Sequence, residues 1–403
     1  MICVQKYGGS SLGTPELIKR VAHQVISQRR KGKDMVVVVS AMRDTTDELL
    51  RLAHRVAEDP PRRETDMLLT VGERISMSLL SMAINSLGTK AISFTGSQCG
   101  IITDSHHTNA RIKDVRPFRI EEELAKGKVV IVAGFQGVSE EKEITTLGRG
   151  GSDTTAVALA YTLRAKECEI LTDVEGVFTA DPRVVPQARR LPHLSYGEML
   201  ELASFGGKVL HPRSVELAQR FKIPLVVKSS FSLKLGTVIK ERGKVEEICV
   251  RAVAYRKGIG AVLLNPSPGK AKGVSRIFRR LSDGGINVDL IVKGAREGGE
   301  ISLSLQKEQL PLAKRILEGL KGEGVLEGIA VFDGLASVSI IGSGIGESPG
   351  IATEMFSALE AEGIPVSFVS SSQLSITCMV SEGVVERATR ALHRAFELNR
   401  MGG

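Results

Sequence analysis

Two short segments of the sequence are apolar at every position, and they limit the folds that the first half of the chain can adopt. Met35–Val39 and Val129–Ala133 contain no polar side chain. Such strands are typical of a parallel sheet covered by helices on both faces, because neither row of side chains faces water. Four further segments have the length and composition of strands in the same sheet: Ile2–Gln5, Ala91–Phe94, Glu169–Thr172 and Pro224–Val227.

The segments between these strands have the amphipathic pattern of helices. Thr14 and Pro15 mark the start of the first helix, since threonine is a favoured N-cap and proline a favoured first helical residue. The predicted helices are Pro15–Gln28, Asp66–Asn85, Asp153–Leu163 and Tyr196–Ser204. Alternating strands and helices predict an α/β layered domain over 1–245, with ligands bound at the carboxyl ends of the strands.

Beyond the charged segment Lys240–Glu247 the pattern changes and then repeats. Pro-Gly pairs begin at 268 and 349, 81 residues apart, and Gly-Ile pairs begin at 285 and 363, 78 apart. With predicted turns at these pairs, an α+β unit of order βαββαβ and about 80 residues occurs twice, over 258–330 and 336–403. Two tandem units without evident catalytic groups favour a binding module, and duplicated structural support is the alternative.

The predicted strands of the two units are Ala261–Leu264, Val288–Val292, Glu300–Leu305, Ala336–Ile341, Val366–Ser370 and Leu374–Val380. The predicted helices are Val274–Ser282, Leu310–Leu320, Ile351–Glu362 and Val384–Leu398.

The charge balance favours small anionic ligands over nucleic acid. The formal net charge is +8, but the basic residues are scattered and only 4% of residues are aromatic. The densest basic run, Arg276–Arg280, is typical of a solvated helix face. Proteins that bind single-stranded nucleic acid need aromatic stacking platforms among their basic groups, so phosphate-bearing small molecules are the expected partners.

The cysteines and the apolar segments predict a soluble, cytoplasmic protein without a membrane partner. No apolar run reaches the ~18 residues of a membrane span, and the first residues do not form a signal peptide. The five cysteines lie far apart, without a disulfide or metal-binding pattern, as expected in a reducing compartment: Cys3, Cys99, Cys168, Cys249 and Cys378.

A glycine motif follows the first predicted strand. In Lys6-Tyr7-Gly8-Gly9-Ser10-Ser11 the paired glycines allow backbone N–H groups to approach an anion, and the lysine adds a positive charge. The motif is not a Walker A loop, because the lysine precedes the glycines. A plain tight turn explains this motif equally well when it is taken alone.

Two more polar motifs follow strands further along the chain. Thr145–Thr155 contains three glycines around Arg149, which can bind a carboxylate through two hydrogen bonds, and Asp153, which can cap a helix or hold an ammonium group. A capped turn explains Asp153 alone but not Arg149. Thr172–Arg183 offers acids, an aromatic ring and an arginine, which suits a nucleotide. Gly207–Pro212 adds Lys208, which alone would be an ordinary surface residue.

Together the motifs resemble those of the aspartate kinases. The matching segments occur in the order and spacing of that family: Lys6–Ser11, Ser40–Asp47, Thr70–Arg74, Gly148–Asp153, Thr172–Arg183 and Lys208–Pro212. The repeat from Gly258 onward resembles the paired ACT regulatory domains of the family. The resemblance covers essentially the whole chain. It implies an amino-acid-kinase-like, mostly parallel sheet flanked by helices, followed by two ACT-like domains.

The resemblance also implies an activity. The family phosphorylates the side-chain carboxylate of L-aspartate with ATP and Mg²⁺, the first step towards lysine (through diaminopimelate), methionine and threonine. Mg²⁺ would be bound through ATP rather than by a protein metal site. Lysine or threonine would act as an allosteric effector at the ACT domains, and the chain would form a homo-oligomer through them.

The family's functional residues are carried over position by position. The catalytic pair would be Lys6 and Asp153. Aspartate would be bound by Ser40, Thr46, Glu73, Arg149, Gly150, Gly151 and Ser152. ATP would be bound by Lys6, Tyr7, Gly8, Gly9, Thr172, Asp173, Phe178, Arg183, Lys208 and Val209. The effector would lie near Ser267, Gly269, Asn287, Val288 and Asp289.

The residue types fit this chemistry. A carboxylate nucleophile has a pKa near 4, so at pH 7 it is already ionised and needs no general base. Catalysis then consists mainly of positioning two anions and stabilising negative charge on the transferring phosphoryl group. The seven histidines are therefore expected to be structural.

Several positions depart from the family pattern. In the first domain they are Arg43, Phe178 and Gly207, and in the repeat they are Pro266, Lys293, Pro365 and Gln373. Because the repeat positions carry few groups that could bind an amino acid's ammonium, we expect feedback inhibition to be altered. Two alternatives remain open: a kinase for another amino-acid carboxylate, such as glutamate or acetylglutamate, and a catalytically silent amino-acid sensor.

Overall fold

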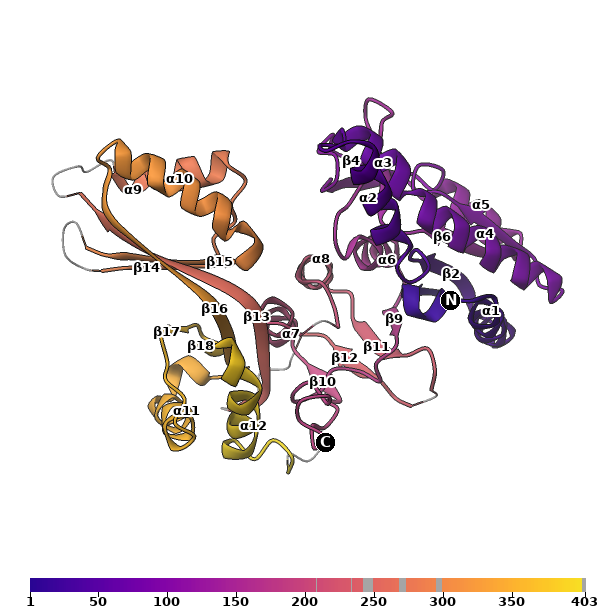
Figure 1. Ribbon diagram of the computed structural model, residues 1–403. Helices are drawn as coiled ribbons and strands as arrows, with labels where there is room; N and C mark the ends of the chain where they lie inside the picture. Colours follow the sequence, from indigo (N-terminus) through magenta and orange to yellow (C-terminus); the bar gives the residue numbers. More distant parts are fainter. Residues whose placement is uncertain (208, 233, 242–248, 268–272, 295–298, 401–403) are drawn as a thin grey trace.

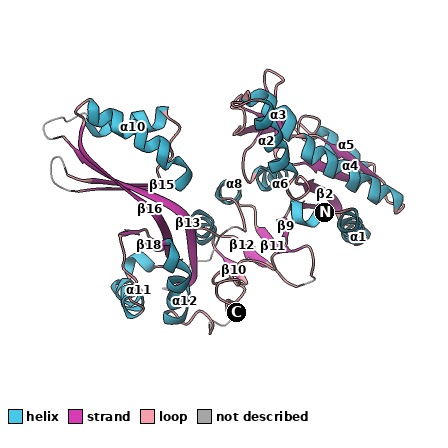
Figure 2. Ribbon diagram, in the orientation of Figure 1, coloured by secondary structure: helices cyan, strands magenta, loops and turns pink. Residues whose placement is uncertain are grey.

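The computed structural model describes residues 1–400 except 208, 233, 242–248, 268–272 and 295–298 (Figures 1 and 2). The N-terminal domain is built on an eight-stranded sheet of order β10-β12-β11-β9-β1-β2-β6-β3. Its central strands β11, β9, β1, β2, β6 and β3 are all parallel, and β12 is antiparallel to β11. The predicted α/β layered architecture is confirmed.

The strands of this sheet are β1 (Ile2–Tyr7), β2 (Asp34–Val39), β3 (Ala91–Phe94), β6 (Val129–Ala133), β9 (Cys168–Thr172), β10 (His193–Leu194), β11 (Leu225–Ser229) and β12 (Thr237–Ile239). The helices of the domain are α1 (Pro15–Arg30), α2 (Thr45–Val56), α3 (Arg62–Leu69), α4 (Val71–Ser86), α5 (Phe118–Ala125), α6 (Gly151–Thr162), α7 (Tyr196–Ser204) and α8 (Pro212–Phe221). A smaller sheet contains β4 (Ile101–Thr103), β5 (Ile112–Val115), β7 (Gln136–Ser139) and β8 (Ile144–Thr146).

Strand β2 shows why a fully apolar strand requires helices on both faces of the sheet. All five residues of Met35–Val39 are inaccessible to solvent. Val36 and Val38 pack into the core on the α6 face, whereas Met35, Val37 and Val39 pack into the core beneath α1 and α4. The alternation of side chains along a strand therefore supplies two hydrophobic cores at once.

The predicted helix Asp66–Asn85 is two helices. Thr70 separates α3 from α4, and its hydroxyl donates to the Met67 carbonyl oxygen at 3.0 Å. The stretch Arg62–Ser86 has the length and apolar composition of a membrane span, which is weak support for one. The inner side of α4 buries Glu73, Met77 and Leu80 against the sheet, as a core helix does.

The sequence did not predict α2, α5, α8 or the smaller sheet. The strands of that sheet are only three or four residues long, too short to show a periodic pattern. Helix α2 has apolar residues at helical spacing, Leu49, Leu52, Ala53 and Val56, although none of its residues is buried.

The C-terminal half forms a six-stranded sheet of order β14-β15-β13-β16-β18-β17. Its strands are β13 (Cys249–Pro266), β14 (Leu290–Lys293), β15 (Ile301–Gln306), β16 (Leu326–Ser343), β17 (Phe368–Ser371) and β18 (Ser375–Ser381). Its helices are α9 (Gly273–Asp283), α10 (Leu310–Gly322), α11 (Pro349–Ala361) and α12 (Val385–Ala395).

The two repeat units, defined as 258–330 and 336–403, share the two longest strands. Residues 259–266 of β13 pair with 326–335 of β16, and 249–256 pair with 337–343. Val250 and Val253 belong to the hydrophobic core of the second repeat unit, which α11 and α12 also line. Figure 1 shows β13 and β16 running from one helix pair to the other. The second repeat unit therefore takes a strand from the chain ahead of the first.

The two Gly-Ile pairs form the predicted turns, whereas the Pro-Gly pair at 349–350 does not. Gly285 and Gly363 both have positive φ, +69° and +62°, at the ends of α9 and α11, where a residue without Cβ is favoured. The Pro-Gly pair at 349–350 forms the first two residues of α11 instead of a turn. The pair at 268–269 lies outside the described residues.

Candidate active site

Lys6 and Asp153 form an ion pair at the carboxyl end of the parallel sheet. The Lys6 Nζ lies 2.7 Å from the Asp153 Oδ1, and the two side chains are 12% and 10% exposed. Lys6 is on the central strand β1, and Asp153 is in the first turn of α6, which begins after Gly150 (φ +70°). Asp153 was expected either to cap a helix or to hold an ammonium group. In the structure it binds the ammonium group of Lys6 and does not cap α6.

The glycine motif brings the ends of β1 and β2 into backbone contact. The Gly8 N–H donates to the Leu171 carbonyl oxygen at 3.0 Å, which joins the motif to β9. A Cβ on Gly9 would lie 2.5 Å from the Ala41 carbonyl oxygen. A Cβ on Gly8 would lie 3.8 Å from the Lys6 Nζ. At position 9, only glycine allows the close approach to the Ala41 carbonyl oxygen.

Glu73 lies on α4 and presents a carboxylate to the end of β2. Its side chain is buried, and its Oε1 accepts a hydrogen bond from the Ala41 N–H at 3.0 Å. Burial raises the pKa of Glu73 to about 7, although the Ala41 hydrogen bond and the positive charge of Lys6 lower it. Among the described residues, the buried Glu73 Oε2 has no hydrogen-bond partner. An unpaired buried carboxylate oxygen is suited to an ammonium group of a ligand.

Ser40 and Thr46 lie on the connection from β2 to α2. The Ser40 N–H donates to the Tyr7 carbonyl oxygen at 3.2 Å, and both Ser40 and Thr46 are half-buried. Arg43, between them, has a φ of +34°. A positive φ is unfavourable for an arginine, which fits the glycine common at this position in the family that the sequence resembles.

The loop that carries Arg149 is held in place by buried polar groups. Asp66 is fully buried on α3, and its Oδ1 accepts from the Thr146 hydroxyl at 2.5 Å. From α8, the Arg213 guanidinium donates to the Leu147 carbonyl oxygen at 2.6 Å. The Arg149 side chain itself is exposed and is therefore accessible to a ligand.

The glycines beside Arg149 permit close packing around Asp153. A Cβ on Gly150 would overlap the side chain of His211, and Ser152 packs directly against Gly134 after β6. His211 is the N-cap of α8, where its Nδ1 accepts from the Arg213 N–H at 3.3 Å. Burial lowers the pKa of His211, while the nearby negative charge of Asp153 raises it.

Three residues of this region were absent from the predicted site: Asp66, His211 and Arg213. Asp66 could have been found in the sequence, because it is an acid directly before the apolar residues 67–69. Arg213 binds carbonyl oxygens of distant loops and the side chain of His211 packs against Gly150, and no local pattern reveals either contact.

The predicted nucleotide segment begins at the end of β9. The Thr172 carbonyl oxygen accepts from the Ser230 N–H at 2.8 Å, and the Thr172 hydroxyl donates to Asp173 at 3.0 Å. The exposed Arg183 makes a two-point contact with Asp181, at 2.7 and 3.0 Å. Phe178 and Val209 are half-buried. Lys208 lies outside the described residues.

The predicted effector residues lie around the turns of the first repeat unit. The Ser267 N–H donates to the Val325 carbonyl oxygen at 3.0 Å, and Asp289 pairs with Arg256 at 2.5 Å. Asn287 is exposed and Val288 packs against the core of the unit. Gly269 lies outside the described residues.

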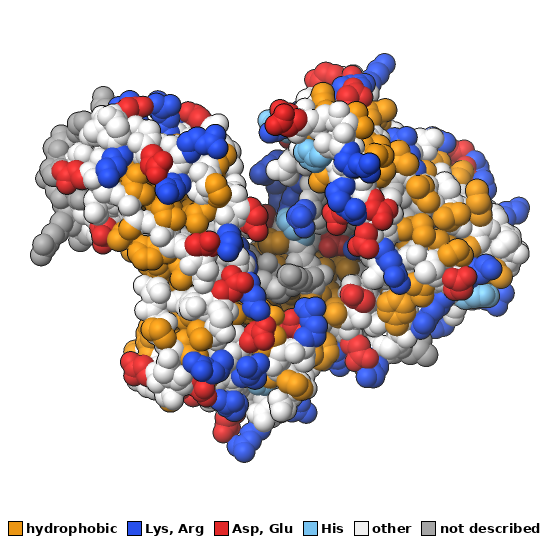
Figure 3. Space-filling model, in the orientation of Figure 1, with side chains coloured by type: hydrophobic (Ala, Val, Ile, Leu, Met, Phe, Trp, Pro, Cys, Tyr) orange, Lys and Arg blue, Asp and Glu red, His pale blue; other side chains and the backbone are white. Residues whose placement is uncertain are grey.

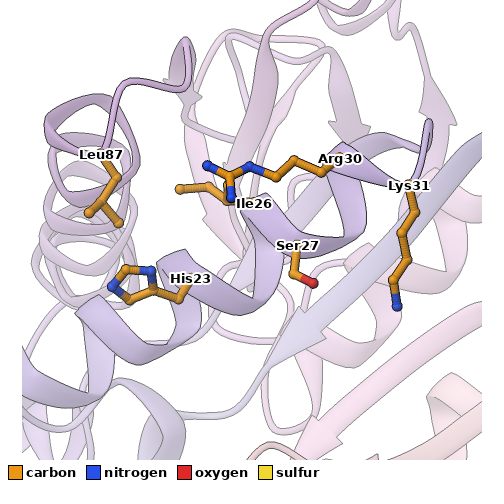
Figure 4. Close-up of a pocket in the computed structure, with 6 residues that line it drawn as sticks. All are labelled: His23, Ile26, Ser27, Arg30, Lys31 and Leu87. Carbon is orange, nitrogen blue, oxygen red and sulfur yellow. The ribbon is translucent and has the colours of Figure 1, made fainter.

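A separate surface pocket of about 450 Å³ contains none of the predicted site residues. Figure 4 shows its lining, which is His23, Ile26, Ser27 and Arg30 of α1, Lys31 directly after α1, and Leu87 directly after α4. In the part of the chain that the structure describes, no group of three or more His, Cys, Asp and Glu side chains could hold a metal ion.

Comparison with known proteins places the chain in a family. Residues 1–229 match the amino acid kinase family and residues 338–396 match an ACT domain. The aspartokinase of Bacillus sp. (strain MGA3) is 48% identical, covering 99% of this chain and 98% of that protein. Aspartokinase 2 of Bacillus subtilis is 46% identical, with coverage of 99% and 98%. The chain belongs to the aspartokinases.

The solved structures agree with this family membership. E. coli aspartokinase III in complex with aspartate and ADP (R-state) superimposes with a TM-score of 0.86 at 26% identity, covering 98% of this chain and 100% of that one. The complex of the same E. coli enzyme with lysine and aspartate (T-state) gives a TM-score of 0.77. The fold expected from the motifs, and the classification as a kinase with ACT domains, are therefore confirmed.

Proposed function

We propose that this aspartokinase transfers the γ-phosphoryl group of ATP to the side-chain carboxylate of L-aspartate, giving 4-phospho-L-aspartate and ADP. The observation that carries the proposal is the Lys6–Asp153 pair, which lies beside the glycine motif at the carboxyl edge of the sheet. In the transfer, the bond from the γ-phosphorus to the β,γ-bridging oxygen breaks and a bond to the aspartate carboxylate oxygen forms. No proton is abstracted, because the nucleophile is already ionised.

Lys6 and the glycine motif would bind the phosphates of MgATP. The Lys6 ammonium would stabilise the negative charge on the transferring phosphoryl group. The Gly8 and Gly9 backbone allows the phosphates to approach without a side chain between them. Asp153 would keep Lys6 extended toward the end of β1. Tyr7, Thr172, Asp173, Phe178, Arg183, Lys208 and Val209 complete the proposed ATP site.

Glu73 and Arg149 would bind the two ends of the aspartate backbone. The unpaired Glu73 Oε2 is suited to the α-ammonium group, and the exposed Arg149 guanidinium is suited to the α-carboxylate. Ser40, Thr46, Gly150, Gly151 and Ser152 would complete the aspartate site. A ligand held at both ends would direct its side-chain carboxylate toward Lys6.

A hydroxamate assay with purified enzyme tests this function. We expect product with aspartate and ATP, and a rate at least ~10²-fold lower with glutamate or acetylglutamate. A longer or acetylated substrate would not place its side-chain carboxylate in position for attack on the γ-phosphorus. Equal rates with these substrates would indicate another carboxylate kinase. No ATP turnover with any of them would indicate an amino-acid sensor.

We propose a catalytic domain at 1–245 and two regulatory ACT-like units at 258–330 and 336–403, with 249–256 as an additional strand of the second.

Lysine or threonine would bind near Ser267, Gly269, Asn287, Val288 and Asp289. Asp289 is the one acid among these five residues, and it is already paired with Arg256. With Pro266, Lys293, Pro365 and Gln373 at the changed positions, we expect weaker inhibition than the family pattern implies. Titrating each amino acid into the assay measures the inhibition, and potent inhibition by millimolar lysine or threonine would contradict the expectation.

We also propose a cytoplasmic homo-oligomer formed through the six-stranded sheet. Its edge strands β14 and β17 expose apolar side chains, Ile291, Val292 and Val369, and an exposed apolar edge favours pairing with another copy. Light scattering of the purified protein gives the mass, and a monomer at micromolar concentration would refute this proposal.

A further inference from the structure

The segment that follows Phe178 is anchored to the second repeat unit rather than to the catalytic domain alone. Thr179 is buried, and its carbonyl oxygen accepts from the Val253 N–H of β13 at 2.8 Å. Ala180, Val184 and Val185 form a small apolar cluster with Tyr255 of the same strand. The predicted nucleotide segment therefore lies directly on β13, which is also a strand of the second repeat unit.

His393 completes this attachment from α12. Its Nε2 lies 2.9 Å from the Thr179 Oγ1, and both side chains are almost fully buried. The same oxygen accepts from the Arg189 N–H at 2.9 Å. In addition, the Arg189 guanidinium donates to the Asn399 carbonyl oxygen at 3.3 Å. In Figure 1, α12 lies on the side of the second repeat unit that faces the segment leading into β10.

The hydrogen bonds of Thr179 determine the conformation of its neighbours. The hydroxyl accepts from Arg189 and is shared with His393, while the Thr179 N–H donates to the Arg189 carbonyl oxygen at 2.8 Å. Phe178 directly precedes Thr179, and Arg183 follows within four residues. A displacement of α12 would therefore move the ring and the guanidinium proposed to contact ATP, but it does not act directly on Glu73 or Arg149.

We propose that His393 is a positioning residue for ATP, which through its hydrogen bond to Thr179 holds the nucleotide segment in its binding conformation. The proposal rests on the assignment of Thr172–Arg183 to ATP. It makes the affinity for ATP, rather than for aspartate, depend on the position of α12 in the second repeat unit. Burial lowers the pKa of His393, so the neutral ring is favoured, and either ring tautomer can form this bond.

The decisive experiment compares His393→Leu and Thr179→Val in the full-length enzyme, since each removes the same bond from one side. Loss of a buried hydrogen-bond partner predicts a rise in KM for ATP of about tenfold in each variant, with kcat and KM for aspartate within about twofold of the parent. Thr179→Val also removes the hydrogen bond from the Arg189 N–H, so the double variant should bind ATP no more weakly than Thr179→Val alone. His393→Gln, which retains a donor and an acceptor, should restore most of the affinity.

Thr389→Val is the matched control. Thr389 is fully buried on the same helix, but its hydroxyl donates to the Val385 carbonyl oxygen within α12. This variant also loses a buried hydroxyl, and its KM for ATP should not change. A parent-like KM for ATP in folded His393→Leu, or additive effects in the double variant, would overturn the proposal. If His393→Leu does not fold, His393→Phe, which keeps an aromatic ring but has no ring nitrogen, takes its place.

Calorimetry with ADP separates this proposal from the proposed reaction. Binding of ADP needs no aspartate turnover, so weaker ADP binding in His393→Leu would support the positioning role even if the assay gave no aspartate phosphorylation. Unchanged ADP binding in an active His393→Leu variant would refute the positioning role and leave the reaction intact.

Discussion

Replacing Glu73 with glutamine should make the protein more stable at pH 8 while it abolishes aspartate binding. Glu73 is 3% exposed, and burial raises its pKa from 4.5 to about 7. The folded state therefore holds this proton more tightly than the unfolded state does. The stability that comes from this proton is fully present below about pH 4.5 and is lost as the pH rises through about 7.

The size of the effect follows from the pKa shift. Each pKa unit corresponds to 1.36 kcal/mol, so ionised Glu73 destabilises the folded protein by about 3 kcal/mol at pH 8. Glutamine is neutral at every pH, and its side-chain oxygen can retain the hydrogen bond from the Ala41 N–H. The buried position of Glu73 Oε2 would then hold an amide instead of an unpaired charge, which costs less free energy.

Thermal unfolding of the parent and Glu73→Gln at pH 5 and pH 8 measures this difference. For a domain of this size, 3 kcal/mol corresponds to a Tm increase of roughly 6–10 °C at pH 8, and little or no increase is expected at pH 5, where the parent is protonated. The variant should also lose aspartate-dependent turnover by at least ~10²-fold, because the amide cannot neutralise an ammonium group. Ser76→Ala, which removes a buried hydroxyl on the same helix, controls for a general effect on α4.

The pH dependence decides the outcome. A Tm difference of the same size and sign at both pH values would refute the reasoning, because a group that gains or loses charge between pH 5 and 8 cannot produce it. Full activity in a folded Glu73→Gln variant would remove Glu73 from the aspartate site.

Further variants test the other site residues. Lys6→Met should lower kcat/KM at least ~10²-fold, because it removes the positive charge that stabilises the transferring phosphoryl group. Parent-like turnover would exclude Lys6 from the mechanism. Arg149→Ala should raise KM for aspartate by about 10²-fold and leave KM for ATP nearly unchanged, so an equal rise in both constants would contradict its assignment. Gly9→Ala should lower both kcat and Tm, because its Cβ would lie 2.5 Å from the Ala41 carbonyl oxygen; an unaffected variant would show that the two loops can separate. Acidification from pH 8 to 6 should raise KM for aspartate about tenfold as Glu73 takes up its proton, and a flat profile would contradict the raised pKa.

Local patterns predicted the elements that lie deepest in the protein. The β2 segment is apolar at five successive positions, and every one of them is buried. The motif after β1 was predicted from its paired glycines at a strand end, and the motif before α6 from the glycines around Arg149. The second motif follows β8 of the smaller sheet, and the Lys6–Asp153 contact joins the two. The strands of the smaller sheet were missed although several of their residues are buried, because three or four residues are too few to show a periodic pattern.

The sequence by itself determined that this chain is a covered parallel sheet with a duplicated α+β unit, because burial and repetition are visible in the order of residue types. Only the tertiary structure decided which distant residues meet. The pairing of 249–256 with 337–343, the support of the Arg149 loop by Asp66, and the bond from Thr179 to His393 all join positions far apart in the chain. Periodicity records whether a side chain is buried but not what it is buried against. The raised pKa of Glu73 has the same origin, because it depends on how completely the surrounding elements exclude water.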